Sequence, residues 1–310
     1  MMYSSKVLHL PRFWQHAAQG TLESDLLSPP VAPPVNQTLL ARFQAGSPSQ
    51  PAPTHAAGSH EIVEPRTLYW FRWVSGHQTS FLIWTFLLLH IKQYQAGACS
   101  MASLEKTASA LFKLYSGILV YTASTSIDVY QQIIRPFMMT YHPGFSGSWA
   151  CDYARLKETM RQSLMREGGS GKLSRAYMAT NQIHGKIGKR LVGHSPSLNK
   201  LAKQAKASQT HANTSAQHVA TPAPDADLAF IFDAFFLVQR SPVGYADLLN
   251  QLVSRLSAIL DDYHQHGFQL GHPGESPTFL AGQHDVWDHL PRHALDCVNA
   301  LLHAAPNHPG

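Results

Sequence analysis

The stretch RWVSGHQTS at residues 72–80 runs directly into FLIWTFLLLH at residues 81–90, and it decides the fold. Its apolar residues show no strand-like alternation, so its length favours a helix. The apolar run that starts at Phe81 ends at Ile91 and is about half of the ~20 residues that a membrane-spanning helix needs. We therefore expect a helix buried in the core of a protein that does not enter the membrane.

His77 and Gln78 form a polar pair at the start of this apolar run, with aromatic side chains on both sides. A histidine in such surroundings has a high desolvation cost unless its ring nitrogens find hydrogen-bond partners. Its ordinary pKa lies near neutrality, which suits proton transfer. The residues alone leave two interpretations open: a core histidine bonded to a backbone carbonyl, or a catalytic group.

The composition indicates a protein with a substantial core. Of its 310 residues, 44% are hydrophobic and 14% are charged. The net charge of +5 is mild, and the basic cluster at residues 186–206 carries no recognised nucleic-acid motif, so we expect no nucleic-acid partner. Cys99, Cys151 and Cys297 form no CxxC pair, which argues against a zinc knuckle or a disulfide framework. Because no secretory signal pattern opens the sequence, we expect a cytoplasmic protein.

Three regions of different composition follow one another along the chain. Residues 1–60 are expected to form an N-terminal segment and a flexible arm, because the prolines there forbid a regular helix. A single folded domain is expected over residues 61–303, with a mobile loop at about 203–226 that has almost no large apolar side chain. Residues 304–310 are expected to form a disordered tail.

Apolar residues at three- and four-residue steps predict helices throughout this domain. The expected helices cover residues 66–96, 103–122, 126–141, 152–166, 174–192, 227–238, 243–266 and 285–303. Pro136 is expected to kink the third of them unless a new helix starts there. No strand pattern stands out, so the predicted fold class is all-α, a helical bundle.

Three polar positions on these helices stand out by their spacing. In order, His77 opens HQTSFLIW at residues 77–84, Arg135 lies nine residues before the glycine of PGFS at residues 143–146, and His184 lies nine residues before Gly193 and the loop HSPS at residues 194–197.

These motifs resemble those of tryptophan 2,3-dioxygenase and its relatives, the histidine-ligated heme-dependent aromatic oxygenases. The resemblance covers about residues 66–200 and implies the helical bundle of that superfamily. The glycine-rich loop of the dioxygenases is absent, and Phe81 stands where they have a glutamate. The strings FRWVSGHQ at residues 71–78 and HPGFSGSW at residues 142–149 are more similar to the heme-dependent L-tyrosine 3-hydroxylases, so we place the chain in that branch.

The resemblance implies a heme cofactor with His184 as the proximal ligand of its iron and His77 as the catalytic group that moves protons on the other side. It also implies that Arg135 binds the substrate carboxylate through its planar guanidinium group. Further contacts to the substrate or to a heme propionate are implied for Tyr69, Phe145, Trp149, Ser195 and Ser197. The residues alone also allow Arg135 in a surface ion pair, His184 as an exposed helix residue and the serines as a helix cap.

The reaction implied by the resemblance is hydroxylation of an aromatic amino acid in a biosynthetic pathway, with L-tyrosine attacked at ring position 3. Hydrogen peroxide or dioxygen would be the oxidant, and the relatives imply a homo-oligomer. The alternatives are a tryptophan-cleaving dioxygenase or a ring-rearranging relative, a heme-binding protein without turnover, and an all-α scaffold without a cofactor.

The string HALDC at residues 293–297 places His293 and Cys297 four positions apart, on one face of a helix. This pattern is similar to the covalent heme attachment of a methyl-tyrosine hydroxylase. We expect a b-type heme, with c-type attachment through Cys297 as the alternative.

Overall fold

The protein is an all-α bundle, as predicted. The structure, a computed structural model, describes residues 7–11, 36–45, 65–166, 171–193, 196, 198, 200–201, 226–267 and 284–305. The helices are α2 (Gln37–Ala45), α3 (Pro65–Gln95), α4 (Met101–Thr122), α5 (Ile127–Val129), α6 (Arg135–Tyr141), α7 (Cys151–Arg166), α8 (Gly171–Val192), α10 (Ala226–Phe235), α11 (Tyr245–His266), α12 (His284–Asp288) and α13 (Leu290–His303). A π-helical turn, η1 (Tyr130–Ile134), joins α5 to α6, and a short 3-10 turn, η2 (Gly147–Trp149), precedes α7.

Helix boundaries agree closely with those expected from the sequence, with two divisions. The expected helix at residues 126–141 consists of α5, η1 and α6, and α6 begins just before Pro136. The expected helix at residues 285–303 is split at His289 into α12 and α13, and Pro291 in the first turn of α13 suits the start of a new helix. Within the described ranges, no helix is long and apolar enough to cross a bilayer. Most of the expected loop at residues 203–226 and of the expected tail lies outside the described residues.

Two short strands, β1 (Leu8–Leu10) and β2 (Val238–Arg240), depart from the prediction that no strand is present. They pair in parallel, with Leu8 opposite Val238. Three residues are too few to show an alternating pattern in the sequence. Because Leu8 and Leu10 are fully buried, this pairing fastens the N-terminal segment to the domain.

The prediction of a helix-free arm is wrong at α2, which lies between Pro34 and Pro48. A proline disrupts a helix only around its own position, and this interval contains none. Leu40 and Phe43 of α2 are buried, and the helix packs against α11. The folded body therefore includes elements before residue 61, whereas residues 1–6, 12–35 and 46–60 of the expected N-terminal segment and arm lie outside the described residues.

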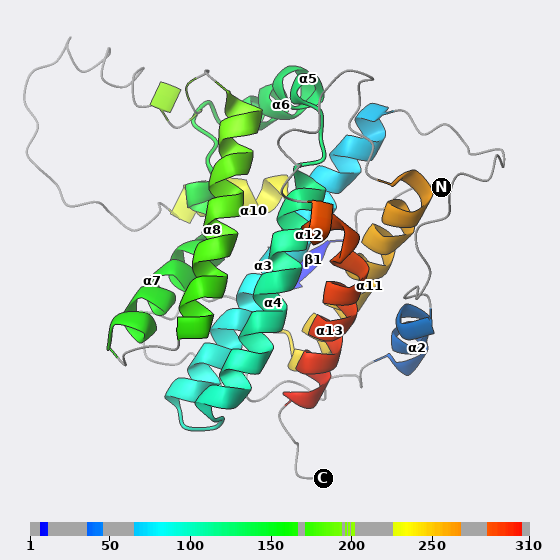
Figure 1. The fold of residues 1–310 in the computed structure, drawn as a ribbon. Helices are drawn as coiled ribbons and strands as arrows, with labels where there is room; N and C mark the ends of the chain where they lie inside the picture. Colours follow the sequence, from blue (N-terminus) through cyan, green and yellow to red (C-terminus); the bar gives the residue numbers. More distant parts are fainter. Residues whose placement is uncertain are drawn as a thin grey trace, which may run out of the picture.

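The long helices α3 and α4 form the centre of the bundle, and α4 also packs against α8 and α13 (Figure 1). The two central helices approach closely at Gly76. A Cβ atom added there would lie 1.9 Å from the hydroxyl oxygen of Thr122 and 3.0 Å from its Cβ. Only glycine fits this crossing, so Gly76 sets how close its neighbour His77 lies to α4.

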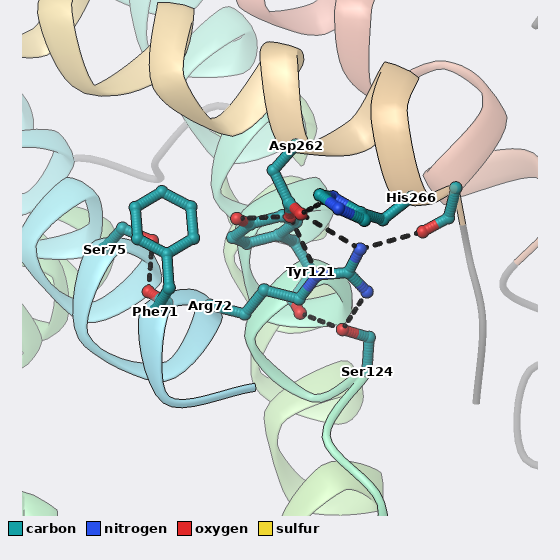
Figure 2. Close-up of polar contacts among 8 residues, drawn as sticks. Phe71, Arg72, Ser75, Tyr121, Ser124, Asp262 and His266 are labelled. Carbon is teal, nitrogen blue, oxygen red and sulfur yellow. Dashed lines mark hydrogen bonds and ion pairs between the residues drawn. The ribbon is translucent and has the colours of Figure 1, made fainter. Parts of the chain in front are cut away.

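A buried ion pair joins three of the helices (Figure 2). Arg72 of α3 and Asp262 of α11 are fully buried, with Arg72 Nε donating to Asp262 Oδ2 at 2.8 Å. The hydroxyl of Tyr121 on α4 donates to the same oxygen at 2.8 Å, and His266 Nδ1 lies 3.0 Å from Oδ1. The guanidinium also donates to Ser124 Oγ at 3.1 Å and to a backbone carbonyl at 2.9 Å. Because these charges lie out of water, they depend on one another and on these neutral partners.

We predict that Gly76→Ala lowers the free energy of unfolding by about 1–3 kcal/mol, because the new methyl group overlaps Thr122. Gly185→Ala in α8 is the matched control, since nothing lies within 4 Å of its added Cβ. This control should stabilise the protein by up to about 1 kcal/mol through helix propensity. Urea denaturation measures both effects, and equal effects would contradict the close crossing of α3 and α4.

We predict that Asp262→Ala lowers the free energy of unfolding by about 3–5 kcal/mol, because it leaves the buried Arg72 without its counter-charge. Adding Arg72→Met removes that charge, so the double variant should be more stable than Asp262→Ala alone. Urea denaturation tests both statements. Glu158→Ala, which breaks an exposed pair with Arg161, is the control and should leave stability unchanged. A double variant no more stable than the single one would contradict the role of the charge.

Candidate functional site

A cavity of about 290 Å³ lies among α3, α4, α6, α8 and α10. Four residues singled out from the sequence line it together: His77, Arg135, Phe145 and His184. The volume is at the lower end of the ~300–1,000 Å³ typical of small-molecule pockets. The three sequence motifs, which come from separate helices and a loop, therefore meet in one place.

His77 has a fixed tautomer and a fixed ring plane. Its Nδ1 lies 2.7 Å from the carbonyl oxygen of Trp73, and because a carbonyl only accepts, Nδ1 carries the proton. Its ring lies against Phe236, stacked at 4.4 Å, and against Trp73, tilted at 4.5 Å. The other nitrogen, Nε2, therefore has an unshared electron pair and can accept a proton or bind a metal.

Burial keeps His77 neutral. Its pKa is lowered from 6.5 to about 4, chiefly by desolvation. The hydrogen bond to Trp73 raises the pKa in part, and the charge of His184 lowers it slightly. The two histidines are thus close enough to influence each other's protonation. At neutral pH, His77 is an acceptor in the cavity rather than a cation.

Gln78 explains why the polar pair is needed at this point. Its side-chain amide donates to the carbonyl oxygen of Phe236 at 2.8 Å, and Arg255 Nε donates to its Oε1 at 3.1 Å. Because Phe236 is the ring stacked on His77, Gln78 positions the wall beside the histidine without lining the cavity itself.

His184 lies on α8 and lines the same cavity with an exposed side chain. Its ring meets Tyr153 edge-on at 6.2 Å. The ring is partly desolvated inside the cavity, which lowers its pKa, and the charge of Lys157 lowers the pKa further. No described residue forms a hydrogen bond with its ring nitrogens, so both are available to a bound group. In this respect it differs from His77, whose ring is held by a backbone carbonyl.

The π-helical turn η1 places Tyr130 and Arg135 on one side of the chain. The N–H of Arg135 donates to the carbonyl of Tyr130, five residues earlier. In an α-helix of about 3.6 residues per turn, positions five apart point to different sides, whereas a π turn brings them together. Pro136 accounts for the wider turn, because in an α-helix its ring would clash with the carbonyl of Gln132. Both Tyr130 and Arg135 line the cavity.

Arg135 is buried and has no carboxylate partner among the described residues. Its Nη2 donates to the carbonyl oxygen of Pro196 at 2.6 Å, and its Nη1 lies 3.5 Å from Gln131 Oε1. The interpretation of Arg135 as part of a surface ion pair is therefore wrong. A buried cation that faces a cavity without a counter-charge favours the binding of an anion there.

Aromatic rings form one wall of the cavity. Phe145 stacks on Phe232 at 5.4 Å, and Phe236 completes this wall beside His77. Trp149 packs behind Phe145 at 5.5 Å, and neither it nor Tyr69 lines the cavity. The predicted contacts of Trp149 and Tyr69 with a substrate ring are thus not supported by their positions, since both are core residues.

The residues fit a planar cofactor that lies beside His184. Gly188 follows His184 by one helical turn and also lines the cavity, and nothing lies within 4 Å of a Cβ added to it. A glycine inside a helix lowers the stability of the helix by about 1 kcal/mol relative to alanine. Its presence here is explained if a flat cofactor packs against the helix where a side chain would otherwise stand. Trp73 also lines the cavity and has a buried indole nitrogen without a described hydrogen-bond partner. Neutral imidazoles, apolar rings and an unused donor are the groups that heme pockets provide.

The remaining predicted site residues are not brought to this cavity. Ser195 and Ser197 lie outside the described residues, so their contacts stay a prediction. His293 and Cys297 lie on α13 and do not line the cavity. Cys297 is fully buried, which raises the pKa of its thiol, and His293 Nδ1 is buried without a described partner. Covalent heme attachment at this pair stays a prediction.

Sequence reasoning missed several residues that shape the site, among them Trp73, Tyr130 and Gly188 on the cavity wall and Phe232 and Phe236 of the aromatic wall. Trp73 and Tyr130 are aromatic residues among many, and only the π turn gives Tyr130 its place beside Arg135. A signal for Gly188 was present, because it stands four residues after His184 on a predicted helix where glycine is unfavourable.

A comparison with protein families gives a match. Residues 29–176 match the model of a family described as SfmD 3-methyl-L-tyrosine peroxygenase. No curated protein matches the chain. The matched range contains His77, Arg135 and Phe145 and ends before His184. Over this range, which is slightly less than half of the chain, the chain is similar to that family.

We predict that the free energy of unfolding falls as the pH is lowered from about 6.5 to about 4, in part because the unfolded chain then protonates a histidine that stays neutral when folded. This contribution is fully present above the ordinary histidine pKa. His77→Gln keeps a neutral side chain and should reduce the slope. Urea denaturation of both proteins at about pH 7 and about pH 4.5 measures the difference. Parallel pH dependence would contradict the neutral state of His77.

Proposed function

We propose that this protein is a heme-dependent peroxygenase that hydroxylates the ring of a tyrosine-type amino acid in the cavity between His77 and His184. The observation that carries the proposal is that these histidines, the buried Arg135 and an aromatic wall line one cavity. The family match adds the substrate class, since the family is named for a peroxygenase of 3-methyl-L-tyrosine. L-Tyrosine itself, hydroxylated at ring position 3, is the related substrate that the motifs favour.

Heme, when bound, supplies the iron centre at which hydrogen peroxide is activated. We propose that His184 holds the iron, because its ring nitrogens have no described protein partner and Gly188 leaves a flat wall beside it. We propose a b-type heme, because Cys297 and His293 lie away from this cavity.

His77 acts as the proton acceptor in the same cavity. Its Nδ1 keeps its proton and donates it in a hydrogen bond to the carbonyl oxygen of Trp73. Nε2 is therefore unprotonated and can act as a base. It can take the proton of peroxide and return it to the oxygen that leaves as water. The rings of Trp73 and Phe236 hold the imidazole plane while this happens.

Arg135 and Tyr130 fix the amino acid. The guanidinium of Arg135 pairs with the α-carboxylate, and the Tyr130 hydroxyl, which has no hydrogen-bond partner among the described residues, lies on the same wall. The carboxylate supplies the counter-charge that Arg135 lacks. The substrate ring then packs against Phe145 and Phe232, and this orientation is the contribution of proximity to the rate.

The test is a titration of the heme-loaded protein followed by its absorption spectrum. The Soret band should shift on addition of L-tyrosine or 3-methyl-L-tyrosine, and peroxide should convert the amino acid to its ring-hydroxylated product. A shift with tryptophan alone would favour the dioxygenase alternative, and binding without product would favour a heme carrier. His184→Ala should lose heme, whereas His77→Gln should retain heme and lose turnover. The reverse pattern would exchange the roles of the two histidines.

We predict that Arg135→Met raises the KM for the amino acid by roughly 10- to 100-fold, as expected for the loss of hydrogen bonds to a charged group. Arg135→Lys should recover only part of this effect, because a lysine cannot bind the carboxylate with a planar fork. Arg161→Met on the exposed face of α7 is the control. Steady-state kinetics with purified variants measures the change, and an unchanged KM for Arg135→Met would contradict its role in binding.

A further inference from the structure

The cavity contains phenol rings of its own. Tyr115, Tyr130 and Tyr153 all line it. Each carries the chemical group that the proposed reaction attacks. If the protein oxidises a tyrosine ring placed in this cavity, its own rings are exposed to the same oxidant whenever the cavity holds no amino acid.

The three rings differ in their surroundings. Tyr153 lies beside His184 at 6.2 Å, and its hydroxyl donates to Asn181 Oδ1 at 3.0 Å, so it stands on the side of the proposed iron ligand. Tyr115 is turned toward Trp84, which it meets edge-on at 5.8 Å. Among the described residues, neither ring packs against His77 or against its neighbour Trp73.

Tyr130 is on the His77 side. Its ring packs against Trp73 at 5.5 Å, and Trp73 packs against His77 at 4.5 Å. Its hydroxyl forms no hydrogen bond with a described residue. Burial raises the pKa of this hydroxyl, and the nearby charge of Arg135 partly offsets the rise. It is therefore a neutral phenol next to the group that would bind the substrate carboxylate.

We propose that Tyr130 is an internal substrate, hydroxylated on its ring ortho to the phenol oxygen when no amino acid occupies the cavity. This inference rests on the proposed peroxygenase function. One oxygen atom of hydrogen peroxide is inserted into a ring C–H bond of Tyr130, and the other leaves as water with the two remaining hydrogens. The peroxide is reduced and the ring is oxidised by two electrons, so no further reductant is needed. The para position is unavailable because it carries the rest of the side chain.

Substrate should protect Tyr130. We expect an amino acid bound to Arg135 to lie against the ring of Tyr130, because Arg135 and Tyr130 share one wall of the cavity through the π turn. Modification of Tyr130 and turnover of free amino acid therefore compete for the same peroxide. A catechol formed at residue 130 would stand beside Arg135 and alter the binding of later substrate.

The experiment uses the full-length, heme-loaded protein and hydrogen peroxide labelled with heavy oxygen, with and without 3-methyl-L-tyrosine. Cleavage before aspartate separates the rings: Tyr130 falls in the peptide 128–151, apart from Tyr115 on one side and Tyr153 on the other. Boronate capture selects catechols and so disregards oxidised methionines. Fragment ions then distinguish Tyr130 from Tyr141, an exposed ring in the same peptide.

The expected result is one heavy oxygen on Tyr130, lost in Tyr130→Phe, lost without heme and strongly reduced by the free amino acid. Label on Tyr115, Tyr141 or Tyr153 in place of Tyr130 would overturn the inference. So would an unlabelled Tyr130 in protein that hydroxylates the free amino acid, and this outcome would leave the proposed function standing. If neither the free amino acid nor Tyr130 gains oxygen, the proposed function fails and the inference fails with it.

Discussion

The rest of the structure depends on the buried pair of Arg72 and Asp262. Two opposite charges that are fully buried and 2.8 Å apart cannot separate without leaving each in an apolar core. Since Tyr121 donates to the same carboxylate, the pair fixes α3, α4 and α11 in one relative register. A one-residue slip of α3 would remove the guanidinium from its partners, and apolar packing alone would tolerate that slip far better.

That register determines where the site lies. Arg72 stands one turn before Gly76 on α3, and at Gly76 this helix crosses α4 in contact with Thr122. The crossing therefore fixes the position along α3 at which the next residue, His77, lines the cavity. The hydrogen bond from His77 to Trp73 and the stacking of Phe236 then leave the imidazole one orientation. The chemistry proposed for His77 thus follows from the packing of two helices rather than from the histidine alone.

The sequence was sufficient for most of the helices but not for their contacts. Helix α3 could be predicted because 31 residues contain no competing pattern. His77 could be chosen because it opens an apolar run, and Arg135 and His184 because each stands nine residues before a glycine in a motif that resembles a known family. The strands and α2 could not be predicted, because three residues show no period and prolines on both sides concealed a short helix. Trp149 seemed a pocket residue by its loop position, yet burial behind Phe145 removed it. The periodicity of apolar residues shows which face of a helix is buried, but it does not show which aromatic side chains line a cavity.

Several departures from local rules gather around the cavity. Pro136 widens the helix into a π turn, Gly188 stands inside α8 with no atom within 4 Å of an added Cβ, and Leu237, next to Phe236, has a φ of 55°. Each weakens its own element, by up to about 1–3 kcal/mol for a residue held in a sparsely populated backbone region. Stability alone would favour an ordinary residue at each place. Their clustering around one cavity, where they place Tyr130, Arg135 and Phe236, is therefore best explained by a requirement of binding or catalysis.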